Sequence, residues 1–152
     1  MIDKENSEII NTGNISTRYG IIAGLGISII LLLFQASGDD FSPLLKISAM
    51  IPLLICIVLA FNKMKSLGAT IFPSGVAAGL KLSLVAAICV TVVNLIFFLI
   101  YPAIAFSKYA ILPDSGANFM IISVILLFEI FVFGGVMSFI MMQSMKRSSK
   151  TK

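Results

Sequence analysis

The sequence predicts an all-α integral membrane protein, in which one domain forms a bundle of four membrane-spanning helices. Composition is the first indication, because 59% of the 152 residues are hydrophobic and only 12% are charged, with a mean hydropathy of +1.07. A soluble domain of this size carries about twice that share of charge. The second indication is a set of four apolar runs that are each long enough, at about 1.5 Å per residue, to cross a hydrocarbon core of about 30 Å. The third is that basic residues gather at the ends of those runs.

The predicted helices span residues 19–36, 44–61, 76–101 and 118–145. Residues 1–18 precede them as a polar cytoplasmic segment, and residues 146–152 follow as a basic cytoplasmic tail. The first helix is expected to stay in the mature chain, because the segment before it is acidic and lacks the short basic start of a secretory signal. Pro43 favours a helix start after Ser42, since proline is accommodated at the first helical position. Pro52 predicts a bend in the second helix, and Pro102 ends the third.

The distribution of Lys and Arg predicts that both termini are cytoplasmic. Two basic residues, Lys46 and Lys108, fall on the other side, together with the loops 37–43 and 102–117. Lys81 lies within the third helix. The basic residues on the cytoplasmic side are Lys4, Arg18, Lys63, Lys65, Lys146, Arg147, Lys150 and Lys152.

Two helices carry small residues at every fourth position, a spacing that lets helix backbones approach closely in lipid. The first helix has Gly20, Gly24 and Ser28. The stripe of the third consists of Gly75, Gly79, Ser83, Ala87 and Thr91. These stripes either pack the helices of one chain together or form a dimer interface.

The fourth helix combines an acid with small residues on different sides. At about 100° per residue, Ser138 lies roughly 180° and Gly134 roughly 140° from Glu129. Because a carboxyl group is unfavourable against lipid, Glu129 is expected to face protein or water. The side of Gly134 and Ser138 is then expected to be free for a second partner, which favours an oligomer or a larger membrane complex.

Three polar residues within the predicted spans are candidates for function. Glu129 lies near the midplane, where it is either a proton- or substrate-coupling carboxylate or a structural hydrogen-bonding group. Lys81 either extends its ammonium to the cytoplasmic interface, pairs with Glu129, or binds an anionic headgroup. Asn94 is interpreted as an interhelical hydrogen-bonding residue.

The residue inventory makes several chemistries improbable. The chain has no His and no Trp, and its two cysteines, Cys56 and Cys89, lie inside apolar runs without metal-ligand spacing. No cofactor, metal or nucleic-acid partner is therefore predicted, and an enzyme is not expected. The basic tail with Lys146, Arg147, Lys150 and Lys152 first anchors the topology and can also attract anionic lipid.

Several segments together resemble the Bacteroidetes membrane-protein family called domain of unknown function forty-one ninety-nine. They are Arg18-Tyr19-Gly20-Ile21-Ile22-Ala23-Gly24 at the start of the first helix, Phe72 to Gly79-Leu80-Lys81 before the third, and the glycine-containing last helix ending in Lys146-Arg147. The resemblance implies a four-helix protein of the bacterial inner membrane. It implies no activity and no catalytic residues.

The predicted function is that of a small non-enzymatic accessory or scaffold subunit, which packs against itself or against another membrane protein. The alternative is a small dimeric proton-coupled transporter in which Glu129 alternately binds protons and a cationic substrate. Four-helix multidrug transporters have a similar architecture, but their essential glutamate lies in the first helix and is accompanied by tryptophan. The first helix here has no acid.

Overall fold

The computed structural model describes residues 2–37, 43–67, 72–100 and 118–148, which form five α-helices. These are α1 (Ile2–Ser37), α2 (Pro43–Ala49), α3 (Ile51–Ser66), α4 (Phe72–Ile100) and α5 (Asn118–Ser148). Within the described residues, four stretches are long and apolar enough to cross a membrane, namely 12–36, 46–66, 75–100 and 120–144. The prediction of an all-helical chain with four such stretches is confirmed.

The first helix is much longer than its predicted range of 19–36. It begins at Ile2 and has 36 residues, so it extends about 54 Å at 1.5 Å per residue, well beyond a hydrocarbon core of about 30 Å. An α-helix pairs its own backbone groups and can therefore continue from lipid into water, and no proline interrupts residues 2–18. The polar segment 1–18 is thus, from Ile2 onward, the first half of α1.

The second predicted helix is broken into α2 and α3 rather than bent. Pro52 has no backbone N–H to pair with the carbonyl of Ser48, and Met50 forms a turn in which its N–H donates to the Ile47 carbonyl at 3.0 Å. The Pro52 ring packs on α1 at Gly26, where a Cβ atom would lie 2.9 Å from the Cβ of Pro52. The break therefore packs against Gly26, where any residue with a Cβ atom would force α1 or Pro52 to move.

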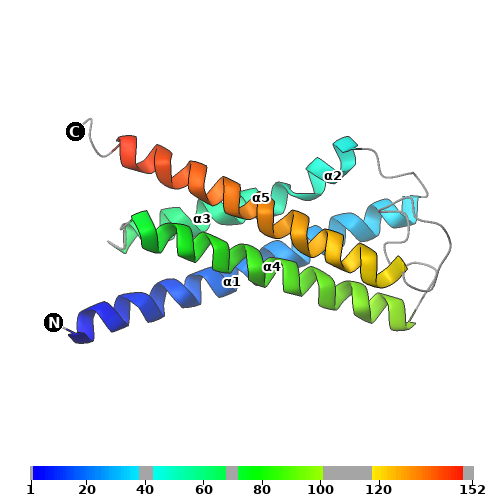
Figure 1. Ribbon diagram of the computed structural model, residues 1–152, viewed down its shortest axis with the longest axis horizontal. Coiled ribbons are helices and arrows are strands. Elements are labelled where there is room, and N and C mark those ends of the chain that lie inside the picture. The colour runs from blue at the N-terminus through cyan, green and yellow to red at the C-terminus, as the bar shows by residue number, and fades with distance from the viewer. Residues whose placement is uncertain (1, 38–42, 68–71, 101–117, 149–152) are drawn as a thin grey trace.

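Helix α4 is the centre of the arrangement. It packs most extensively against α5 and α1, while α3 packs chiefly on α1. Figure 1 shows α5 and α4 side by side, and it places the start of α1 and the end of α5 at the same end of the bundle. Large apolar side chains such as Ile27, Leu82 and Leu126 fill the interior and are fully buried.

Helices α4 and α5 run antiparallel and are interlocked by small residues. A Cβ atom on Gly79 would collide with the side chain of Ser138, and one on Gly134 would lie 2.6 Å from the Cβ of Ser83. One turn before Gly79, Gly75 meets Met142. The register is therefore constant, because each step of four residues forward along α4 is matched by a step of four residues back along α5. At these positions the two backbones approach as closely as glycine allows.

Helices α1 and α4 run parallel and meet through the glycines of α1. A Cβ atom on Gly20 would lie 2.8 Å from the Leu82 carbonyl oxygen, and one on Gly24 would lie 2.6 Å from the Cβ of Cys89. The hydroxyl of Ser28 donates to the Gly24 carbonyl at 2.8 Å, so this buried polar group is satisfied within its own helix. Both small-residue stripes therefore pack within one chain.

The side of α5 that carries Gly134 and Ser138 is covered by α4. The sequence argument expected this side to be free for a second partner, and the structure corrects that expectation. The helical wheel identified which α5 residues share a side, but it could not identify which helix of the same chain lies against that side.

Replacing Gly134 by alanine is expected to lower the free energy of unfolding by about 1–3 kcal/mol, the usual cost of overpacking. The Ser83 Cβ at 2.6 Å cannot rotate away. Unfolding in mixed micelles measures the effect. Gly135→Ala is the matched control, because its Cβ would meet only the flexible tip of Leu80 at 3.1 Å.

The second variant in this test combines Gly134→Ala with Ser83→Gly, so that the position without a side chain lies on α4 instead of α5. It is expected to recover most of the lost stability, because the Leu53 side chain at 3.3 Å is then the nearest remaining obstacle. Equal losses for the single and the double variant would contradict the described α4–α5 contact.

Candidate functional site

Glu129 lies in the middle of α5 and of the candidate span 120–144. Its side chain is half-buried and is engaged in an interaction within the fold. The α5 residues that meet α4 lie on another side of the helix, whereas the neighbouring Phe128 and Val132 are 65% and 43% exposed. Glu129 therefore occupies a flank of the bundle rather than the seam between α4 and α5.

Lys81 and Glu129 are not brought together. The Lys81 ammonium lies over α1, where a Cβ atom on Gly13 would be 3.1 Å from Nζ. In the α4–α5 register Glu129 is level with Ile88, seven residues or about 10 Å from Lys81 along the helix axis. The lysine side chain extends in the opposite direction, toward the end of the bundle where α1 begins.

Asn94 forms the buried polar contact between α4 and α5. Its side chain is fully buried, and its Nδ2 donates to the Ser123 hydroxyl at 3.1 Å. The register of the glycine contacts continues to this pair, because Asn94 lies eleven residues after Ser83 on α4 and Ser123 lies eleven residues before Gly134 on the antiparallel α5. The Oδ1 atom of Asn94 has no hydrogen-bond partner in the described part of the structure.

Within the described helices, the hydroxyls of the small-residue stripe are hydrogen-bonded on α4, whereas the hydroxyl of Ser138 on α5 is not. Ser83 donates to the Gly79 carbonyl at 2.9 Å, and Thr91 donates to the Ala87 carbonyl at 2.9 Å. The buried hydroxyl of Ser138 has no partner among the described residues. The stripe therefore holds the two helices together by close packing, and its α4 hydroxyls donate to carbonyls of their own helix. These described hydroxyls do not converge on a site that could bind a ligand.

The basic tail and the two cysteines, which the sequence also singled out, have few described contacts that bear on function. Lys146 and Arg147 belong to the last turn of α5, whereas Lys150 and Lys152 lie outside the described residues. Cys56 is buried, and the Sγ of Cys89 lies 4.0 Å from the Ile21 carbonyl oxygen on α1. No group of three or more His, Cys, Asp or Glu side chains gathers anywhere in the described ranges.

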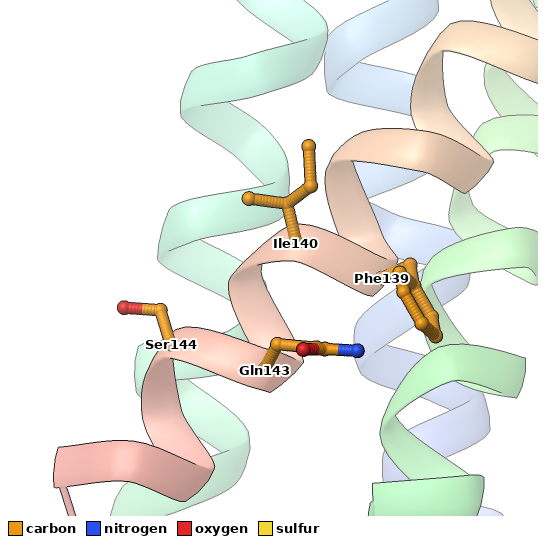
Figure 2. Close-up of a pocket in the computed structure, with 4 residues that line it drawn as sticks. All are labelled: Phe139, Ile140, Gln143 and Ser144. Carbon is orange, nitrogen blue, oxygen red and sulfur yellow. The ribbon is translucent and has the colours of Figure 1, made fainter.

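Sequence reasoning missed two features. Ser123 was not selected, although the register that pairs Gly79 with Ser138 also pairs Asn94 with it. A shallow hollow of about 360 Å³ on α5 was also missed, and Figure 2 shows the side chains around it. Its lining consists of Phe139, Ile140, Gln143 and Ser144. Such a hollow could not be predicted from the sequence, because its shape depends on the side-chain rotamers of the folded chain.

Comparison with known proteins adds no relative: no family model matches the chain, and no curated protein and no solved structure matches it. The argument for function therefore depends on the residues and contacts described above.

A double-mutant cycle on Asn94 and Ser123 is expected to give a coupling free energy of about 0.6 kcal/mol, within the range of up to about 1.7 kcal/mol found for hydrogen bonds between membrane helices. The variants are Asn94→Ala, Ser123→Ala and the double substitution, and the free energy of unfolding in mixed micelles is the measured quantity. Additive losses would contradict the contact, because independent residues show no coupling.

Proposed function

We propose that the protein is a small non-enzymatic subunit of a membrane complex, acting as an accessory or scaffold component. The observation that carries the proposal is the interlocked seam of α4 with α5 and α1. Because backbones meet at glycine distance there, these contacts leave no room for a substrate path between α4 and α5 or between α4 and α1 at the positions of the glycines. A bundle closed in this way offers its outer surface as the part that acts on other molecules.

The flank of α5 beside Glu129 is the surface that fits a protein partner best. Phe128, Val132 and Val136 are exposed on it, and Glu129 is half-buried at its edge. Glu129 is already engaged in an interaction within the fold. Because a carboxyl group in the middle of a span is unfavourable against lipid, the exposed part of its side chain and the apolar side chains beside it are better covered by a neighbouring transmembrane helix. The partner helix belongs to another membrane protein or to a second copy of this chain.

The proposed location is the inner membrane of a bacterium, with both termini in the cytoplasm. The resemblance noted in the sequence supports the compartment. Support for the orientation comes from the start of α1 and the end of α5 lying at one end of the bundle. Lys63 and Lys65 lie in the last turn of α3, and Arg18 lies in the first half of α1, which begins at that end. Positive residues are retained in the cytoplasm.

Proton-coupled transport through Glu129 is the second candidate function, and the mid-span position of this half-buried acid is the observation that favours it. A transporter would work as a dimer with Glu129 at the interface, since the seam within one chain is closed. Glu129→Gln separates the two functions, because a coupled transporter loses proton-driven flux while its assembly persists.

The native complex, solubilised gently, is expected to have a mass well above that of one 16.4 kDa chain and to contain a stoichiometric partner. Val136→Trp, two turns from Glu129 on the same side of α5, is expected to reduce partner recovery about tenfold or more, the effect of losing a hot-spot contact of about 1.4 kcal/mol. Quantitative mass spectrometry of the purified complex measures the recovery.

Val92→Trp on the outer face of α4 is the matched control, because Val92 is 47% exposed and Val136 is 54% exposed. It is expected to leave the complex intact. A lone chain in the wild-type preparation, or equal partner loss in both variants, would contradict the scaffold proposal. A lone homodimer with proton-driven flux that Glu129→Gln abolishes would establish the transporter instead.

A further inference from the structure

Four basic side chains at one end of the bundle have no acidic counterpart among the described side chains. Arg18, Lys63, Lys65 and Lys81 are all exposed. In the ranges 12–36, 46–67, 75–100 and 120–144, where side chains are described, Glu129 is the single acid, and it lies about 10 Å deeper than Lys81 along the axis. Among the described side chains, this level of the bundle therefore carries four basic groups and no acid.

Contacts between helices place the four charges at one level. Gly26 of α1 meets Pro52 of α3, and because these helices run antiparallel, Lys65 is level with Gly13 and Lys63 with the residue two positions later. The Lys81 ammonium also lies at Gly13. Arg18 is five residues further along α1, so the Lys81 ammonium and the backbone positions of Arg18, Lys63 and Lys65 fall within about 8 Å along the bundle axis.

The course of the Lys81 side chain shows where this level lies relative to the membrane. Lys81 precedes Leu82, which packs opposite Gly20, yet its ammonium lies over Gly13, at least about one turn nearer the end of the bundle. A long basic side chain adopts this course when it reaches from the apolar region toward headgroups and water. Gly13 makes room for the ammonium because it has no side chain.

Exposed polar residues begin at the same level on three helices. Asn14 on α1, Asn62 on α3 and Gln143 on α5 are all exposed, and Gln143 follows Met142, which meets Gly75 near the start of α4. The hollow in Figure 2 has Phe139 and Ile140 on its membrane side and the polar Gln143 and Ser144 beyond them. The change from apolar to polar surface, where the border between hydrocarbon and headgroups is expected, thus lies at the level of the four basic residues.

We infer that Arg18, Lys63, Lys65 and Lys81 form a ring that binds the phosphate groups of anionic phospholipids in the adjacent leaflet. Charge complementarity supports this partner, because the four basic residues lie at the expected headgroup depth and no described acidic side chain lies at their level. The acids of α1, Asp3, Glu5 and Glu8, lie further out, and the nearest is about 8 Å beyond Gly13 along the helix. Lys81, held over Gly13, is the central ligand.

Native mass spectrometry of the full chain, titrated with phosphatidylglycerol and separately with phosphatidylcholine, tests the inference. The wild type is expected to bind phosphatidylglycerol preferentially, and Lys81→Gln is expected to weaken that binding about fivefold, the factor that corresponds to about 1 kcal/mol per basic group near an anionic surface. Lys63→Gln with Lys65→Gln is expected to weaken it about 25-fold by the same reasoning. Lys81→Arg is expected to retain it.

Lys46→Gln is the matched control, because it removes the same charge from α2, which lies at the other end of the bundle. It is expected to leave phosphatidylglycerol binding unchanged. Equal binding of the two lipids by the wild type, or equal weakening by Lys81→Gln and Lys46→Gln, would overturn the inference. Melting temperatures in phosphatidylcholine nanodiscs, expected to be the same for all variants, verify that each one is folded.

Discussion

Close backbone contact between α4 and its two neighbours holds this bundle together. In lipid the hydrophobic effect does not favour helix association, so packing and polar contacts between helices must supply the free energy. Gly79 and Gly134 bring α4 and α5 together, and Gly20 and Gly24 do the same for α1 and α4. The remaining features depend on the register that these contacts impose.

That register decides which residues lie inside and which lie on the surface. It buries Asn94 against Ser123 and leaves Glu129 on a flank of α5 beside exposed apolar side chains. It also brings Lys81 to α1 at Gly13, level with the basic residues of α3. The flank beside Glu129 and the basic end are therefore separate surfaces, and we propose a protein partner for the first and anionic lipid for the second.

The membrane spans were predictable from sequence because hydropathy and length suffice for them. The stripes of α1 and α4 were predictable as packing surfaces, since their spacing places them on one side of each helix. Helix pairing was not predictable: it depends on three-dimensional fit, so Ser138 was expected to be free and Ser123 was overlooked. Helix boundaries also differed. The largest difference is at the start of α1, which continues from water into lipid without a local signal, and Pro52 breaks the second span. In addition, α3 ends at Ser66 rather than at 61, α4 begins at Phe72 rather than at 76, and α5 ends at Ser148 rather than at 145.

Cross-linking between α4 and α5 tests most directly whether the small-residue seam closes a single chain. Asn94→Cys and Ser123→Cys replace the two residues that share the 3.1 Å hydrogen bond, in a chain whose native cysteines are changed to alanine. With a short thiol-specific cross-linker in native membranes, the structure predicts a product with the mass of one chain, retained when the protein is diluted. A product of doubled mass from chains that each carry one of the two cysteines would show that the seam joins two molecules and would contradict the account.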